Sequence, residues 1–370
     1  MKIGINGRVL TSLKMEGVAR YIYETTLQMA LTNPEDEFVL FHDRKIDTDF
    51  NFPPNVSSVV VPWHARHPIL WFWWFEMMLP FFFKLKKIDV FYSGDGYLSK
   101  RSKIPTVLVM HDLAYLHYPE QIAASTLKYY QKNVPEFLRK ADKVIAVSNY
   151  VKQDIVAQIG IDETKVSVAY NAVSPPQDVD YSTLPPDISV AINGSKYFIY
   201  IGAIHPRKNI IRLIKGFDLF NKKMNSSFKL VIAGRMAWHT DDIKDAINTT
   251  PQVVYIGMVS EPVKYKLIKN ALAMTYISVF EGFGIPILEA MKMGTPVITS
   301  NVTSMPEVAA GAALTVDPNS EIDIANAMTQ LVENDTIRQE FINKGLNRYK
   351  DFSWQKSADI IYSALKNVAK

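Results

Sequence analysis

Short, continuous apolar runs alternate with amphipathic stretches through nearly the whole chain. Continuous runs of this kind indicate strands that are buried on both faces. Strands that alternate with helices imply a parallel sheet covered by helices on each side. The helical pattern is clearest over residues 18–31 and 125–140. The first set of expected strands covers residues 2–7, 37–41, 89–92, 106–110 and 143–147.

A second set of apolar runs begins near Tyr197, after a segment that contains four prolines, residues 174–189. A chain of 370 residues exceeds the size at which one hydrophobic core usually stops growing. We therefore expect two Rossmann-like, doubly wound α/β domains that face each other across a cleft, with ligands outside the carboxyl ends of the strands. The second set of expected strands covers residues 197–202, 229–234, 253–257, 273–278 and 295–299.

The expected domain boundaries follow from this pattern. Residues 1–173 form the first domain, 174–190 a linker, and 191–352 the second domain. The last helix, within residues 353–370, is expected to cross back onto the first domain, with Trp354 as its anchor.

Composition excludes several classes of protein. The net charge of +4, from 41 basic and 37 acidic residues, is too balanced to indicate nucleic-acid binding. The absence of cysteine excludes disulfides and thiolate metal sites, and it fits a reducing compartment. The start of the chain has the pattern of a strand rather than of a secretory signal. We therefore expect a cytoplasmic protein.

The most informative motif is VFEGFGIPILEAMKMGTPVITSN, residues 279–301. Gly282 and Gly284 permit close approach of the backbone to a ligand, Pro286 suits the first turn of a helix, and Gly294 suits its end. The amides of Phe283, Gly284 and Ile285 are expected to face the cleft at the helix N-terminus. That arrangement favours an anion or a row of sugar oxygens.

Two glutamates bracket this turn. Glu281 precedes the glycines and Glu289 lies about one turn inside the helix. Carboxylates accept hydrogen bonds from vicinal hydroxyls, so the pair could hold a hexose and a ribose. The simpler interpretation is a solvated loop glutamate and a helix glutamate stabilised by the dipole. The full set of glutamates, glycines and proline favours the functional interpretation.

Three further segments follow expected strands and carry chemistry. After the strand that ends at Gly202, Arg207 and Lys208 place two cations where a diphosphate would fit. His111, with Asp112 beside it, ends another strand. Gly17 begins the first helix, but a single glycine is a weak dinucleotide signal. Asn149 is equally well explained as part of a helix cap.

No metal or cofactor is expected. Asp47 with Asp49, and Asp178 with Asp180, imitate an Asp-x-Asp metal motif, but two carboxylates without further ligands make a poor metal site.

The aromatic segment PILWFWWFEMMLPFFF, residues 68–83, is too short to span a bilayer and contains Glu76 and Pro80. Aromatic residues around a whole helix favour burial. The lysines that follow leave open an alternative, in which part of the segment makes peripheral contact with the inner face of a membrane.

The motif at 279–301 resembles the donor-binding signature of family-four retaining glycosyltransferases, in which two glutamates are separated by seven residues. The likeness covers essentially the whole chain and implies the two-domain GT-B fold. Within the family it looks most similar to bacterial mannosyltransferases of surface-polysaccharide (O-antigen) assembly.

The resemblance also implies roles for the residues named above. Glu289 would bind the ribose and Glu281 the donor hexose, with the backbone of residues 282–285 lining sugar and phosphates. Arg207 and Lys208 would stabilise the leaving diphosphate, and His111 would lie near the anomeric centre. Gly17 would approach the donor phosphate and the acceptor. Asn149 and Gly202 are further donor-site candidates.

The implied function is transfer of a hexose, best taken as mannose from GDP-mannose, to a glycan or lipid-linked glycan, with retention of configuration. The nucleotide sugar is then a co-substrate rather than a cofactor. Three alternatives remain open: a UDP-sugar-dependent transferase, a nucleotide-sugar epimerase on the same fold, and a non-catalytic sugar-binding protein. The last would be expected to have lost the charged positions named above, which are all present here.

Overall fold

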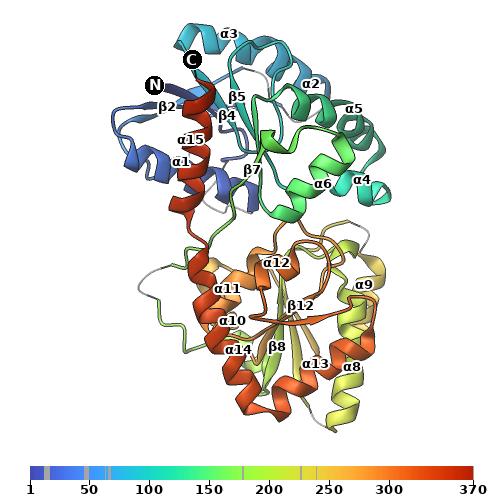
Figure 1. Cartoon of the computed structure of the whole chain (residues 1–370). Coiled ribbons are helices and arrows are strands. Elements are labelled where there is room, and N and C mark those ends of the chain that lie inside the picture. Colours follow the sequence, from blue (N-terminus) through green and yellow to red (C-terminus); the bar gives the residue numbers. More distant parts are fainter. Residues whose placement is uncertain are drawn as a thin grey trace. The chain divides into compact units, whose positions relative to one another are not determined.

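The computed structural model of the chain describes residues 1–11, 17–45, 50–62, 64–65, 68–176, 179–225, 227–238 and 240–369. It divides into two compact units (Figure 1). Unit 1 comprises Met1–Asn171 and Ser353–Lys370, and unit 2 comprises Ala172–Phe352. Each unit contains one parallel sheet between layers of helices, so the prediction of two Rossmann-like domains is confirmed.

Unit 1 has a seven-stranded sheet in the order β3-β2-β1-β4-β5-β6-β7, with every described neighbouring pair parallel. Its strands are β1 (Lys2–Asn6), β2 (Glu37–His42), β3 (Val56–Val60), β4 (Val90–Ser93), β5 (Thr106–Met110), β6 (Lys143–Ala146) and β7 (Val166–Val168). Its helices are α1 (Gly17–Thr32), α2 (Pro68–Trp73), η1 (Trp74–Met78), α3 (Leu79–Lys86), α4 (Ala114–His117), η2 (Pro119–Gln121), α5 (Ala124–Lys140), α6 (Asn149–Ile159), η3 (Glu163–Lys165) and α15 (Trp354–Val368).

Adjacent residues of β4 show why the sheet is apolar on both faces. The Phe91 ring lies 4.7 Å from the Phe83 ring of α3. The next residue, Tyr92, points the other way, and its hydroxyl lies 3.0 Å from that of Thr25 in α1. Because side chains alternate along a strand, a run without polar interruptions is what a sheet covered on both sides requires.

Helix α15 completes unit 1 from the far end of the sequence. It packs along α1 and against β4, β5 and β6. Trp354 is buried, and its ring meets that of Tyr21 edge-on at 5.8 Å. Ser357 donates a hydrogen bond to the carbonyl of Tyr170. The last helix therefore belongs to the core of the first unit.

Unit 2 has a six-stranded parallel sheet in the order β10-β9-β8-β11-β12-β13. Its strands are β8 (Tyr197–Ile201), β9 (Lys229–Ala233), β10 (Val253–Gly257), β11 (Ala273–Tyr276), β12 (Val297–Ser300) and β13 (Leu314–Val316). Its helices are α7 (Pro186–Ile192), η4 (Pro206–Lys208), α8 (Ile210–Met224), α9 (Asp241–Thr249), α10 (Glu261–Lys269), α11 (Ile285–Met293), α12 (Met305–Ala309), α13 (Glu321–Glu333), α14 (Asp335–Arg348) and η5 (Tyr349–Asp351).

The same alternation organises unit 2. Phe198 of β8 meets the Phe220 ring of α8 at 5.3 Å. Its neighbour Tyr197 reaches the opposite helix layer, where its hydroxyl donates to the carbonyl of Leu267 in α10 at 2.7 Å. In each unit one strand thus touches both helical layers.

The structure adds elements to those predicted. All ten expected strands are present, and three more appear at the sheet edges: β3, β7 and β13. Helix α7 begins at Pro186, inside the segment expected to be a linker. Among the residues that the structure describes, no helix is both long and apolar enough to cross a membrane.

Candidate functional site

The glycine loop before α11 has the geometry that its sequence predicts. Gly284 caps the helix with a φ of 101°, where a side chain would be strained. A Cβ on this residue would also come within 3.0 Å of Ile287. Pro286 lies in the first turn, and Gly294 ends the helix in the left-handed conformation. Ser304 fixes the loop backbone, because its hydroxyl donates to the carbonyls of Glu281 and Phe283.

Lys208 connects the basic segment to the glycine loop. Its Nζ donates to the Tyr276 hydroxyl at 2.8 Å and also to Oε1 of Glu281. Lys208 ends the 3-10 turn η4 after β8, whereas Glu281 follows β11, the neighbouring strand in the sheet. The carboxyl ends of the two strands therefore bring together charges that are 73 residues apart in sequence.

Glu281 is buried, so it is not the solvated loop residue of the simpler interpretation. Burial alone raises the pKa of this carboxyl, but the opposing attraction of Lys208 and Arg207 wins, and its pKa lies below the ordinary value. Glu281 is therefore ionised at neutral pH. The site carries two cations against one carboxylate.

Arg207 and Gly202 lie in the same segment after β8 as Lys208. The Arg207 guanidinium lies 5.7 Å from the centre of the Phe280 ring, and its backbone carbonyl accepts from the amide of Val279 at 3.0 Å. Gly202 ends β8 with a φ of 150°. Its carbonyl oxygen would lie 1.8 Å from a Cβ on Gly234, so the two loop glycines pack with no room for a side chain.

Glu289, the second glutamate, lies in a separate ion pair. It is buried in α11, and Lys264 of α10 donates to its Oε1 at 2.6 Å. The Tyr265 hydroxyl reaches the same oxygen at 3.3 Å. The prediction named Glu289 but missed Lys264, because nothing in the local sequence distinguishes this lysine from a surface helix residue.

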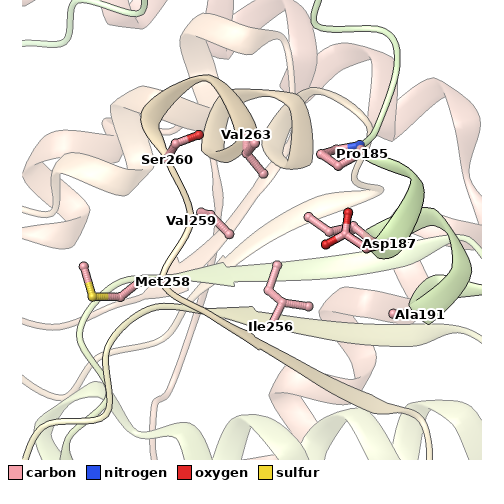
Figure 2. Close-up of a pocket in the computed structure, with 9 residues that line it drawn as sticks. Pro185, Asp187, Ala191, Ile256, Met258, Val259, Ser260 and Val263 are labelled. Carbon is pink, nitrogen blue, oxygen red and sulfur yellow. The ribbon is translucent and has the colours of Figure 1, made fainter.

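A pocket of about 340 Å³ lies where β10 leads into α10, the helix that carries Lys264 (Figure 2). Figure 2 shows Ile256, Met258 and Val259 on one side and helix α7 on the other. Val263, next to Lys264 in the sequence, closes it from α10. Its other lining residues are Pro185, Asp187, Ile188, Ala191 and Ser260.

In unit 1, His111 follows β5, as predicted. Its Nε2 lies 2.8 Å from the carbonyl of Gly94, and its ring meets that of Tyr21 edge-on at 5.3 Å. Because a carbonyl can only accept, Nε2 carries the proton and Nδ1 is left as an acceptor. Burial lowers the pKa of the imidazole, which favours this neutral form. The Asp112 carboxylate accepts from the amide of Ala114, the first residue of α4.

The remaining predicted positions in unit 1 differ in how far packing explains them. Gly17 begins α1, and an added Cβ would meet nothing within 4 Å, so packing gives no reason for a glycine there. Asn149 donates to the Tyr170 hydroxyl at 2.9 Å, while Ser148 caps α6. Beyond these positions, the His117 imidazole contacts the Asp154 carboxylate at 2.9 Å.

A polar cluster that the sequence did not predict lies at the carboxyl ends of β1 and β4. Arg8 donates to Asp95 at 2.8 Å and lies 4.9 Å from the centre of the Tyr97 ring. Asn6 donates to the same carboxylate at 2.6 Å. Nothing in the local sequence indicates a role for Arg8, because its partner Asp95 lies 87 residues away.

Among the residues that the structure describes, no cluster of three or more suitable metal ligands occurs. Asp180 caps its own turn by accepting from Ser182. Asp47, Asp49 and Asp178 lie outside the described residues.

Comparison with known proteins follows the division into two units. The model of Glycosyltransferase Family 4 matches residues 15–176, and the model of Glycosyl transferases group 1 matches residues 186–348. The chain is 26% identical to O-antigen chain mannosyltransferase B of Escherichia coli, over 95% of this chain and 96% of that protein. It is 28% identical to O-antigen chain mannosyltransferase RfbU of Salmonella typhimurium, over 72% of each.

Solved structures agree on the fold. WaaG, a glycosyltransferase involved in lipopolysaccharide biosynthesis, superposes with a TM-score of 0.73 at 15% identity, covering 98% of this chain and 99% of WaaG. Anabaena HepE in complex with UDP-glucose gives a TM-score of 0.70 at 17% identity, covering 99% and 100%. The chain is therefore a hexosyltransferase with the GT-B fold, in which a Glycosyltransferase Family 4 domain is followed by a Glycosyl transferases group 1 domain.

Proposed function

We propose that this enzyme transfers mannose from GDP-mannose to a glycan or lipid-linked glycan in surface-polysaccharide synthesis, with retention of anomeric configuration. The observation that carries the proposal is the contact of Lys208 with Glu281 and Tyr276, beside Arg207. It provides fixed cations and a fixed carboxylate at the carboxyl edge of one sheet. The choice of mannose rests on the relatives named as O-antigen mannosyltransferases.

In this proposal the two glutamates divide the donor between them. Glu281 accepts hydrogen bonds from the hexose hydroxyls, and its ionised state suits an acceptor. Glu289 accepts from the ribose hydroxyls, and the ion pair with Lys264 holds its carboxylate in place. The amides of residues 283–285 lie at the start of α11, where the helix dipole favours phosphate oxygens.

In the proposed chemistry, catalysis comes mainly from stabilising the departing diphosphate. The bond from the anomeric carbon to the diphosphate oxygen breaks, and the acceptor hydroxyl oxygen forms the new bond on the same face. The departing diphosphate takes the acceptor's proton. Arg207 and Lys208 stabilise the charge that develops on it, which lowers the barrier more than it strengthens donor binding. His111, neutral and with Nδ1 as an acceptor, would contact a hydroxyl of the transferred sugar.

The pocket in Figure 2 is proposed to receive the nucleobase. It is lined mainly by apolar side chains, which suits a flat ring. Val263 and Lys264 are neighbours on α10, so this helix lines the pocket and also holds the ribose-binding Glu289. The backbone at residues 257–259 offers polar groups to the edge of a base.

A thermal-shift screen with GDP, UDP, ADP and dTDP, and with their common sugars, tests the donor. A ligand that binds only the folded state raises the melting temperature. We expect a shift with GDP and a larger one with GDP-mannose. A shift with UDP alone would overturn the choice of mannose but keep the site, whereas no shift with any nucleotide would remove the site. An inverted product would contradict the same-face mechanism.

A further inference from the structure

The aromatic segment predicted from the sequence forms one continuous helix in unit 1, here called the aromatic helix: α2, η1 and α3, Pro68–Lys86. The residues at its internal junctions keep helical backbone angles. The Leu79 amide donates to the Trp74 carbonyl, five residues back, which widens the turn just before Pro80. Proline has no amide to donate, so the wide turn accommodates it without breaking the helix.

One face of the aromatic helix is firmly held by unit 1. Trp74, Phe75, Leu79 and Phe83 are buried, so the burial predicted for the whole helix holds for this face and is wrong for the opposite one. Glu76 is buried too, and its carboxylate accepts from Ser99 at 3.3 Å and from the amides of residues 100 and 101 at 3.0 Å each. These contacts fix the rotation of the helix about its own axis, so its other face stays exposed.

That other face is exposed and apolar. Trp73, Met77, Phe81 and Leu85 follow one another at four-residue intervals, one helical turn apart, and lie on one side of the helix. With Phe72 they form what we call the exposed stripe, each side chain between 42% and 60% exposed. The other exposed large apolar side chains among the described residues are spread over different elements, as is normal for a protein surface.

Cations flank the exposed stripe. Lys84 and Lys87 are exposed at its end, with Lys86 half-exposed between them. Arg101, fixed through the Glu76 contacts, lies 5.3 Å from the centre of the Phe72 ring. Nearby Lys100 is already paired with Glu136, and the exposed Asp89 accepts from the amide of Lys2. A hydrogen bond from a neutral amide leaves Asp89 its negative charge, but Lys84, Lys86, Lys87 and Arg101 outnumber it, so the net charge beside the stripe is positive.

We propose that the exposed stripe and its cations form a docking surface for an anionic phospholipid bilayer. Aromatic and aliphatic side chains would enter the boundary between headgroups and acyl chains, while the lysines and Arg101 meet lipid phosphates. Either signal alone gives weak, reversible attachment, and the two together give stable attachment. The inference rests on this surface alone and does not depend on the proposed donor.

Co-sedimentation of the full chain with vesicles tests the proposal. We expect binding to vesicles of equal parts phosphatidylglycerol and phosphatidylcholine, weakened by salt, and little binding to phosphatidylcholine alone. Phe81→Ser and, independently, Leu85→Ser should each lower the partition coefficient about tenfold. Lys84→Glu should lower it several-fold for the anionic vesicles.

The matched control is Ile322→Ser, which removes an equally exposed apolar side chain from α13. It should bind vesicles as the unaltered chain does. Because Phe81 and Leu85 are exposed, melting temperatures should not change, and nucleotide binding should be retained in all variants. Absence of vesicle binding, or binding unaffected by both serine substitutions, would overturn the proposal. A dimer in solution that Phe81→Ser dissociates, without vesicle binding, would instead identify a second copy of the chain as the occupant.

Discussion

Lys208 is the residue on which the proposed chemistry most depends, because one ammonium group contacts both Glu281 and Tyr276. Replacing it with alanine removes a fixed positive charge from the position where the leaving diphosphate would develop negative charge. We expect Lys208→Ala to lower kcat by about 10²- to 10³-fold, with a much smaller change in KM for the donor. Steady-state kinetics with saturating acceptor measure both constants.

A control for this substitution lies on the next helix. Lys215 of α8 is exposed, and the ion pair that it makes with Glu321 is long, at 3.4 Å. Lys215→Ala should leave kcat and KM unchanged. If Lys208→Ala raised KM and left kcat intact, the lysine would serve binding rather than the chemical step.

Glu289 should behave in the opposite way. Glu289→Ala removes the proposed acceptor for the ribose hydroxyls, a contact that is the same in the ground state and the transition state. We expect donor affinity to fall about ten- to a hundredfold while kcat at saturation changes little. Equilibrium titration with the nucleotide diphosphate measures the affinity, and unchanged affinity would contradict the role.

Glu281 makes the stability of unit 2 depend on pH. Its folded-state pKa lies below the ordinary value, so ionisation stabilises the fold above the unfolded pKa, and this contribution is lost as pH falls through the folded pKa. The free energy of unfolding of the unaltered chain should therefore exceed that of Glu281→Gln most at neutral pH. The difference should start to shrink near about pH 4.5, the ordinary pKa of a glutamate, and continue to shrink at lower pH. Urea denaturation of both proteins along this range is the measurement, and a constant difference would contradict it.

Sequence alone revealed those residues whose chemistry is unusual for their position. Glu281 precedes Gly282 after one apolar run, and Arg207 and Lys208 follow another. The sequence predicted each as a site residue but did not predict the contact between Lys208 and Glu281, which arises because two neighbouring parallel strands end at one edge of the sheet. Lys264 and Arg8 could not be foreseen. Each depends on a partner far away in sequence, Glu289 and Asp95, and the pairing is set by how a helix or strand packs.

At the scale of elements, two glycines at the ends of elements, Gly234 after β9 and Gly17 at the start of α1, differ in what requires a glycine there. Gly234 has a φ of 149° and no room for a Cβ against Gly202, whereas Gly17 has free space around it and an ordinary φ. We expect Gly234→Ala to destabilise the fold by about 2 kcal/mol or more. Gly17→Ala should leave stability unchanged or raise it by up to about 1 kcal/mol.

If Gly17 is a glycine because a ligand approaches it, Gly17→Ala should still lower activity. Thermal unfolding of both variants, with initial rates for Gly17→Ala, separates the two reasons for a glycine. Full activity of a stable Gly17→Ala would remove this residue from the proposed donor site.

The edge strands show where prediction of elements from sequence reaches its limit. Central strands such as β5 are buried throughout and appear as continuous apolar runs. Strand β3 contains the exposed Ser57 and Ser58, and β7 and β13 have three residues each, so none produces such a run. They form because a neighbouring strand offers unpaired backbone groups, information that a local pattern does not contain.

At the scale of the whole molecule, one of the two compact units is not a continuous stretch of sequence. Unit 1 is assembled from both ends of the sequence, because residues 353–370 pack with residues 1–171. Without α15, the surfaces of Tyr21 and of β4, β5 and β6 that it covers would be open to water. Unit 2 is continuous, and the contacts of Glu281 and Glu289 lie wholly within it.

This arrangement predicts an asymmetry between fragments. Residues 172–352 should fold alone and bind GDP, because the sheet, both ion pairs and the pocket of Figure 2 are contained in that stretch. Residues 1–171 should fold poorly alone and recover when a peptide of residues 353–370 is added, since burial of Trp354 and Leu365 supplies part of the core. Circular dichroism and thermal shifts with GDP measure both outcomes. A cooperative, stable 1–171 fragment would show that α15 covers unit 1 without being needed for its fold, and a folded 172–352 fragment that ignores every nucleotide would place the donor contacts elsewhere.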